Sequence, residues 1–215
     1  MKKTNQTKHG FTLAEILITL TVIGVVAALT IPTLLQNTQQ AELKTAWKKE
    51  FADLNQATIS LITDAGGSLK GYFSNSVDMR NKFASKLTPI KTCTNSLTEG
   101  CWYDTWYSLD GTKTGPSSYY TFSGMILNNG SLVTVDYKST DCSTNWGGQD
   151  NFCGVLSVDV NGLKPPTTVG KDIFFVLVAE NQLIPRGVRG DAAGACTGST
   201  GQWSGYGCAA EYLYN

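Results

Sequence analysis

The stretch GFTLAEILITLTVIGVVAALTIPTLL, residues 10–35, decides the architecture of this 215-residue chain. Between Phe11 and Thr30 it contains a single charged residue, Glu15. A helix of about 20 residues rises about 30 Å, which is the thickness of the hydrocarbon core of a bilayer. A secretory signal peptide has a shorter apolar run and a small-residue cleavage site after it. The stretch therefore predicts a membrane-spanning helix over residues 11–31.

The residues before this helix predict its orientation. Lys2, Lys3 and Lys8 precede the apolar run, and no acidic residue accompanies them. Basic residues beside a span stay on the cytoplasmic side of the membrane. We therefore expect a single-pass protein of the inner membrane, with everything after the span in the periplasm or outside the cell.

Two residues do not fit a plain membrane anchor. A glycine, Gly10, stands directly before the apolar run, and a carboxylate, Glu15, stands within it. A carboxylate in a membrane helix costs about 2.5–3.5 kcal/mol, so it indicates a function and a partner. The sequence GFTLAE at residues 10–15, followed by the apolar run, resembles the type IV prepilin signature. Pilins and the pseudopilins of type II secretion and competence systems share this signature, and Gly24 and Pro32 also stand where the family places helix-loosening residues.

The resemblance implies a processing site and a means of assembly. Residues 1–10 would be a leader that a prepilin peptidase removes between Gly10 and Phe11, after which the same enzyme N-methylates Phe11. The carboxylate of Glu15 would then neutralise the new amine of a neighbouring subunit, because two paired charges cost far less in lipid than two separate ones. The alternative is that Glu15 extends to the cytoplasmic headgroups. The implied partners are other copies of the chain, related pilins, the peptidase and an inner-membrane assembly platform.

A second helical pattern covers residues 32–65. Apolar residues recur at spacings of three or four, which predicts an amphipathic helix that packs one stripe on a globular domain. Gly66 and Gly67 end it. Pro32 is expected to kink or locally melt the helix, because proline lacks a backbone donor. The stripe comprises Leu43, Trp47, Phe51, Leu54, Thr58, Leu61 and Ala65.

The remaining residues, 66–215, predict a β-rich extracytoplasmic domain. Residues 125–135, MILNNGSLVTV, are typical of a hairpin with its turn at Asn-Asn-Gly. Further strands are expected at 102–108, 119–127, 155–160 and 172–179, and a short helix at 77–87. One long helix followed by strands indicates an α+β fold with the helix against an antiparallel sheet.

Six cysteines lie in this outer domain and predict disulfides, because the topology places them in an oxidising compartment. Their spacing groups them into three local pairs, 93–101, 142–153 and 196–208. A disulfide-bounded loop near the C-terminus is also a feature of many pilins. The cysteines are Cys93, Cys101, Cys142, Cys153, Cys196 and Cys208.

One acidic loop is a candidate metal site. Asp159, Asn161 and Asp172 offer hard oxygen ligands of the kind that calcium prefers. The segment is similar to the calcium loop of major pseudopilins, although Pro165-Pro166-Thr167 departs from the Pro-Asn pair of that loop. The alternative is an Asn-Gly turn between two strands that binds no metal. Apart from this structural calcium, no cofactor is indicated.

Composition argues against an enzyme and against nucleic acid binding. The single histidine, His9, lies in the expected leader, so histidine-based catalysis is excluded from the mature chain and no catalytic residue is assigned. Lys+Arg and Asp+Glu are 17 each, whereas binding to polyanions needs a clustered basic excess. The aromatic residues at 102–107 and 119–122 are expected to pack in the core. The predicted function is a structural subunit of a type IV pilus-like or pseudopilus filament. The alternative is a minor or tip pilin that binds a surface, DNA or a secreted substrate.

Overall fold

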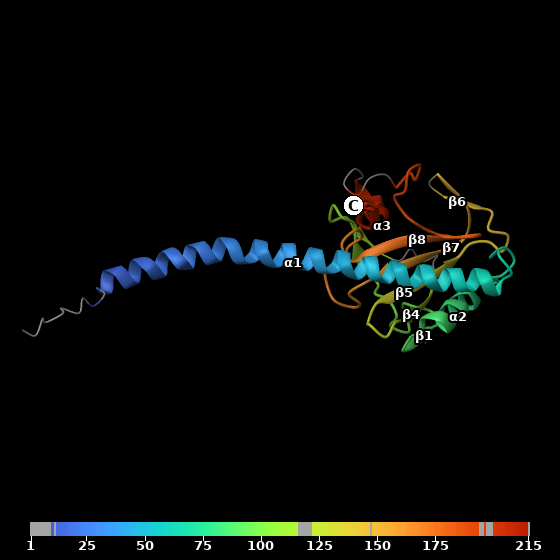
Figure 1. The fold of residues 1–215 in the computed structure, drawn as a ribbon, viewed down its shortest axis with the longest axis horizontal. Helices are drawn as coiled ribbons and strands as arrows, with labels where there is room; N and C mark the ends of the chain where they lie inside the picture. The colour runs from blue at the N-terminus through green and yellow to red at the C-terminus, as the bar shows by residue number, and fades with distance from the viewer. Residues whose placement is uncertain are drawn as a thin grey trace, which may run out of the picture. The chain divides into compact units, whose positions relative to one another are not determined.

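The computed structural model describes residues 10, 12–115, 122–146, 148–193, 196 and 200–214 (Figure 1). The chain divides into two compact units, Met1–Ala41 and Glu42–Asn215. Its elements are α1 (Leu13–Asp64), α2 (Ser76–Leu87), β1 (Lys91–Cys93), β2 (Trp106–Tyr107), β3 (Lys113–Thr114), β4 (Ser123–Ile126), β5 (Leu132–Tyr137), β6 (Thr144–Trp146), β7 (Gln149–Asp159), β8 (Ile173–Ala179), β9 (Leu183–Pro185), the 3-10 helix η1 (Gly201–Trp203) and α3 (Cys208–Tyr214). The predicted α+β fold with a long N-terminal helix is confirmed.

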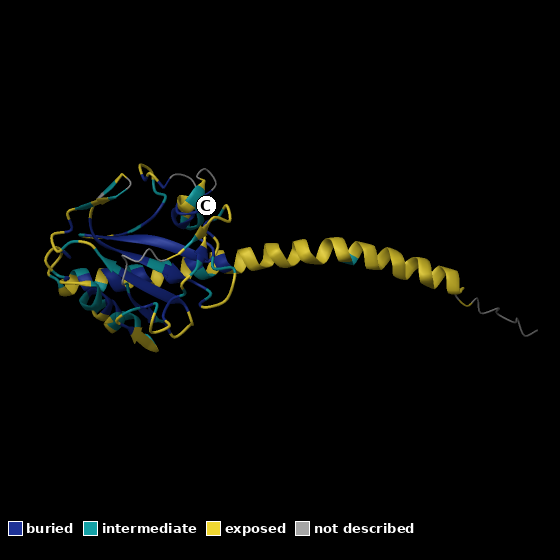
Figure 2. Cartoon of the chain, turned by 180° about the vertical axis from the view of Figure 1, so that it is seen from behind, coloured by how far each residue is buried: buried dark blue, intermediate teal, exposed yellow. Residues whose placement is uncertain are grey.

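The first unit contains the apolar part of α1. Its described side chains are exposed almost throughout, as the yellow colour of this segment in Figure 2 shows. Exposed leucine, isoleucine and valine recur all round the helix, so this part has no single buried face. The expected local melting at Pro32 is wrong, because the residues on both sides of Pro32 are helical. Proline removes only one backbone donor, and the flanking turns keep theirs.

In the second unit, α1 buries one stripe against the sheet. The buried residues are Leu43, Trp47, Glu50, Leu54, Ala57, Thr58 and Leu61. Five of the seven residues of the predicted stripe are among them, whereas Phe51 and Ala65 are only partly buried and Glu50 and Ala57 were not predicted. The ring of Trp47 stacks on that of Phe174 with centroids 4.5 Å apart. Its Nε1 donates to the carbonyl oxygen of Ala209 at 2.9 Å, so the indole is both buried and satisfied. Beyond Asp64, Gly66 and Gly67 adopt positive φ and end the helix.

The main sheet is antiparallel, with strand order β1-β4-β5-β7-β8-β9 and β6 paired to β7. Side chains alternate between its two faces. Val133 and Val135 of β5 join the same hydrophobic cluster as Trp47, whereas Thr134 between them points to the opposite face. On β8, Phe174 packs with the helix and Phe175 joins a second cluster on the far side. Both faces of the sheet are therefore covered, one of them by α1.

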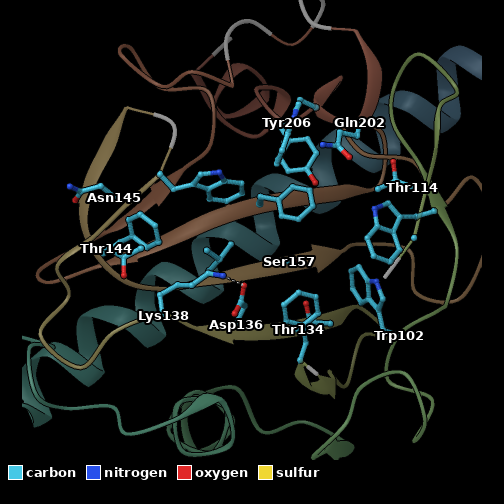
Figure 3. A pocket seen from close by; sticks show the side chains of 18 residues that line it. Trp102, Thr114, Thr134, Asp136, Lys138, Thr144, Asn145, Ser157, Gln202 and Tyr206 are labelled. Carbon is cyan, nitrogen blue, oxygen red and sulfur yellow. Dashed lines mark ion pairs between the residues drawn. The ribbon is translucent and has the colours of Figure 1, made fainter. Parts of the chain in front are cut away.

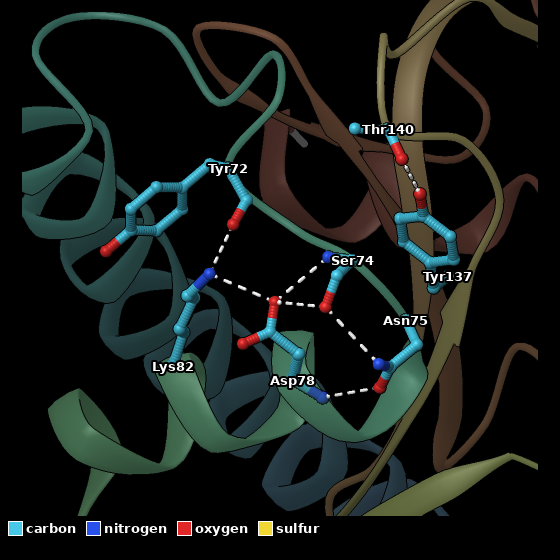
Figure 4. A network of polar contacts seen from close by, with 7 residues as sticks. All are labelled: Tyr72, Ser74, Asn75, Asp78, Lys82, Tyr137 and Thr140. Atoms are coloured by element: carbon cyan, nitrogen blue, oxygen red, sulfur yellow. Dashed lines mark hydrogen bonds and ion pairs between the residues drawn. The ribbon is translucent and has the colours of Figure 1, made fainter.

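Helix α2 covers the same face as α1, since Met79 and Phe83 belong to the cluster of Trp47. Its N-terminus is capped by Asn75, whose side-chain oxygen accepts from the backbone nitrogen of Asp78 at 2.9 Å. The carboxylate of Asp78 accepts from the backbone of Ser74 and forms an ion pair with Lys82 (Figure 4). These contacts fix the start of α2, which begins within one residue of the predicted position.

Three local disulfides join Cys93 to Cys101, Cys142 to Cys153, and Cys196 to Cys208, as the spacing predicts. The predicted strand 102–108 is wrong in extent, because only Trp106 and Tyr107 pair with a neighbouring strand, β3. The chain turns tightly before it, and Cys101 donates its backbone hydrogen to the carbonyl of Ser96. The first two aromatic residues after this turn, Trp102 and Tyr103, stack on one another with centroids 4.8 Å apart.

The packing of Trp47 yields a stability prediction. Replacing Trp47 with Ala is expected to lower the free energy of unfolding by about 3–5 kcal/mol, because it leaves a cavity beside Phe174 and an unpaired Ala209 carbonyl. The matched control is Ile59→Ala on the same helix, where the side chain is 49% exposed and the loss should stay near about 0.5 kcal/mol. Denaturant unfolding measures both. Equal losses would contradict the assigned packing face.

Candidate functional site

The N-terminal start of α1 is organised around Glu15. Its Oε2 accepts from the backbone nitrogen of Thr12 at 2.8 Å and from the Thr12 hydroxyl at 2.9 Å. The backbone nitrogen of Glu15 donates in return to the Thr12 hydroxyl at 3.3 Å. Thr12 and Glu15 thus form a capping box, which satisfies donors that the first turn of a helix leaves free. In a single chain the carboxylate is held by its own helix.

The predicted processing residues, Gly10 and Phe11, lie just before α1 in the sequence. Gly10 is exposed. Phe11, the predicted site of methylation, and the rest of the leader before Gly10 lie outside the described residues. The sequence suggested an intermolecular role for Glu15 and did not suggest the capping box. The signal was present, because Thr-x-x-Glu before an apolar run is the pattern of that motif.

The helix that follows Glu15 can cross a membrane. Among the described residues, α1 is the one helix that is long and apolar enough, and its most apolar window has no buried residue. Glu15 is the only charged residue between Leu13 and Ala41. The large apolar side chains are widely exposed, Leu13 at 78% and Leu29 at 72%. An apolar surface of this extent requires lipid or other protein to cover it.

The predicted acidic loop is brought together by the end of β7 and the start of β8. Asp159 pairs with Ile173 in the sheet, so its neighbour Asp172 lies beside it. Oδ1 of Asp159 accepts from the backbone nitrogens of Asn161 and Gly162, both at 2.9 Å. Asp172 accepts from two backbone nitrogens at 2.6 and 2.7 Å. All three predicted residues therefore lie at the β7–β8 connection, with Asp159 and Asp172 fully buried and Asn161 partly buried.

The carboxylates in this loop repel one another. Burial, followed by the charge of Asp172, raises the pKa of Asp159 to about 7. Burial also raises the pKa of Asp172, and backbone donors offset part of this effect. The hydroxyl of Tyr103 donates to Oδ2 of Asp159 at 2.5 Å, and burial raises the pKa of that phenol. Two fully buried acids thus stand together, and in the described part of the chain neither forms an ion pair.

The donor set fits a calcium ion in part. Oδ1 of Asn161 is buried and has no hydrogen-bond donor among the described residues, while its Nδ2 donates to the carbonyl of Pro165 at 3.1 Å. An orphaned amide oxygen beside two carboxylates offers three oxygen ligands of the right kind. No group of three His, Cys, Asp or Glu side chains gathers at a metal distance in the described chain. Backbone carbonyls and water would have to complete the coordination shell.

Comparison with known proteins identifies the N-terminal segment. Residues 5–31 match the family model described as the prokaryotic N-terminal methylation motif, which is the signature of type IV pilins and pseudopilins. The match covers the capping box, Glu15 and most of the apolar part of α1. Comparisons with curated proteins and with solved structures find no match. The resemblance seen in the sequence is thereby confirmed for this segment.

Proposed function

We propose that this chain is a structural subunit of a type IV pilus-like or pseudopilus filament. In this role a prepilin peptidase cleaves between Gly10 and Phe11 and methylates Phe11, and an inner-membrane platform assembles the subunits. The observation that carries the proposal is the exposed apolar part of α1, which contains most of the methylation motif and has Glu15 as its single charged residue. Such a helix is stable in lipid before assembly and against its own copies afterwards. The domain that follows would lie in the periplasm and then on the filament surface.

Glu15 would link the two states of the chain, the single subunit in the membrane and the subunit in the filament. In the free chain its carboxylate accepts from Thr12, so the motif enters the membrane with that charge already hydrogen-bonded. Cleavage creates an amine on residue 11, one helical turn before Glu15. An amine from an adjacent subunit would add a charge-assisted bond to this carboxylate, which sets the axial register of neighbouring helices. No catalytic activity is required of the chain in this role.

Two substitutions at Glu15 separate capping from charge. Gln retains the capping box but removes the charge, whereas Ala removes both. We expect the Glu15→Gln and Glu15→Ala chains to be cleaved and to remain in the membrane, yet to be lost from sheared filaments by at least about tenfold, since the unpaired amine stays in lipid. Immunoblots of membrane and filament fractions, in cells whose native copy is deleted, measure this.

The matched control is Glu42→Gln, which makes the same change at an exposed acid of the same helix outside the apolar stretch. This variant should assemble normally. Incorporation of Glu15→Gln at the wild-type level would overturn the charge-pairing role, and a wild-type chain that is never cleaved would overturn the filament role.

We also propose that the loop of Asp159, Asn161 and Asp172 binds one structural calcium ion. Two observations support this proposal. The carboxylates of Asp159 and Asp172 are adjacent and buried, and a divalent cation would neutralise their charges. The same cation would be a partner for the buried Oδ1 of Asn161, which accepts no hydrogen bond from any described residue. The ion would tie the end of β7 to the start of β8. The alternative function, a minor or tip pilin, is favoured by a cavity on the far face of the sheet, which is described below.

Calcium binding predicts a shift in thermal stability. With free calcium about 100-fold above its dissociation constant, the free energy of unfolding should rise by about 2.7 kcal/mol relative to chelator. Asp172→Asn should abolish most of this rise. Asp110→Asn is the control, because Asp110 also accepts backbone bonds in a loop but is exposed and distant in sequence. Thermal melts with calcium and with chelator measure it, and identical melts would exclude the ion.

A further inference from the structure

The face of the sheet opposite α1 contains a cavity of about 550 Å³. Sites for small molecules commonly measure about 300–1,000 Å³ and combine aromatic walls with a few polar groups. This cavity has both features. Four of the five tryptophans of the chain line it, Trp102, Trp106, Trp146 and Trp203, and the fifth, Trp47, belongs to α1 and packs on the other face of the sheet.

The aromatic walls are held in place by contacts beneath them. Phe175 and Tyr206 stack in parallel with centroids 4.3 Å apart, and Trp203 meets Tyr206 edge-on at 5.2 Å. The guanidinium of Arg186 lies 4.1 Å from the ring centre of Trp146 and is itself buried. Trp102 and Trp106 form a second wall, with centroids 6.5 Å apart. The walls are therefore preorganised, which lowers the cost of binding.

The floor of the cavity carries polar groups among apolar ones, because strand alternation sends Thr134, Ser157 and also Val155 away from α1. Thr134 and Asp136 of β5 and Ser157 of β7 face the cavity, as Figure 3 shows, with Trp102 and Thr114 to one side and Thr144 and Asn145 to the other. Gln202 stands at the rim. Nε1 of Trp106 is buried and has no acceptor among the described residues. Hydroxyl and amide groups thus alternate with aromatic rings around one space.

The charge of the described lining is balanced. Its one cation, Lys138, forms an ion pair with Asp136 at 2.6 Å, and Asp136 is its one acid. A nucleic acid strand would stack on aromatic rings but would also need basic groups for its phosphates. A purely apolar ligand would leave the hydroxyl groups of the floor without partners. The ligand that matches the lining is neutral, with apolar faces and hydroxyl edges.

We infer that this cavity binds a neutral oligosaccharide. A sugar ring presents C–H groups on its faces, which stack on tryptophan and tyrosine, and hydroxyl groups at its edges, which suit Thr134, Ser157 and Gln202. A ligand oxygen would also give Nε1 of Trp106 the acceptor that it lacks. The site goes beyond the proposed filament role and does not depend on it, since the cavity lies within the second unit alone.

The test uses the full chain in lipid nanodiscs, which avoids detergents with sugar headgroups. Short neutral oligosaccharides are screened by tryptophan fluorescence, because four of the five tryptophans line the cavity. Their sialylated or sulfated counterparts and a single-stranded oligothymidylate serve as charged comparisons. We expect at least one neutral oligosaccharide to bind with a dissociation constant of about 1 mM or tighter and the charged probes to bind more weakly.

Two variants and one control assign binding to the cavity. Trp203→Ala removes a rim ring that is 45% exposed, and Ser157→Ala removes only a hydroxyl from the floor. We expect each to weaken binding, Trp203→Ala by about tenfold, without changing the melting temperature by more than about 2 °C. Tyr214→Ala removes an exposed ring away from the cavity and should leave binding unchanged.

Binding of no neutral oligosaccharide, binding that both cavity variants retain, or preference for a charged probe would each overturn the inference. Filament incorporation is scored for the same variants. Normal filaments without oligosaccharide binding would reject this site and leave the filament role standing. Oligosaccharide binding by a wild-type chain that never enters filaments would reject the filament role and leave the site standing.

Discussion

The seating of α1 on the sheet is the constraint on which the rest of the outer domain depends. Trp47 occupies the centre of this contact, between the strands and the carbonyl of Ala209. Because strand side chains alternate, placing Phe174 under the helix obliges Phe175 to face the other way. The same alternation places Val133 and Val135 under α1 and Thr134 on the far face. The packing of α1 on one face of the sheet therefore determines which side chains of each strand point to the opposite face.

A buried acid fixes the axial position of the helix. Glu50 is 1% exposed, and its Oε2 accepts from the side chains of Asn129 and Ser131 in the β4–β5 turn, at 2.7 and 3.0 Å. A slide of α1 by one turn would leave this carboxylate buried without donors, which costs more than the loss of an apolar contact. Apolar side chains would accept several positions along the sheet. The polar contact accepts one, so it supplies specificity that the hydrophobic stripe lacks.

Short sequence patterns predicted the elements that depend on residues close together in the chain. The helical period gave the buried stripe of α1, the Asn-Asn-Gly turn gave the β4–β5 hairpin, and cysteine spacing matched the three disulfides. The strand expected at 102–108 is shorter than predicted, because a tight turn bends the chain at Cys101 and the rings of Trp102 and Tyr103 stack on one another. The local melting expected at Pro32 does not occur, because the helical turns on both sides of it keep their own backbone hydrogen bonds.

The candidate sites also differ in how far the local sequence predicts them. The methylation motif is contiguous, so its residues could be read directly. The acidic loop was anticipated because its residues are close in sequence, but the burial of Asp159 and the orphaned oxygen of Asn161 depend on the fold. The aromatic residues at 102–107 were expected in the core; Trp102 and Trp106 are buried there and also wall the cavity, whereas Tyr107 is 41% exposed. Of the aromatic group expected in the core at 119–122, Tyr119 and Tyr120 lie outside the described residues. The lining of the cavity comes from segments separated by up to about half of the chain, which no spacing in the sequence reveals.

The three disulfides close loops of 8, 11 and 12 residues, and none links distant parts of the chain. Each bridge therefore holds the two ends of one short segment at a fixed separation. Two of these segments carry walls of the cavity, since Trp146 lies between Cys142 and Cys153, and Trp203 and Tyr206 lie between Cys196 and Cys208. Those two bridges therefore restrain the rings of the cavity locally, without a link to distant parts of the chain.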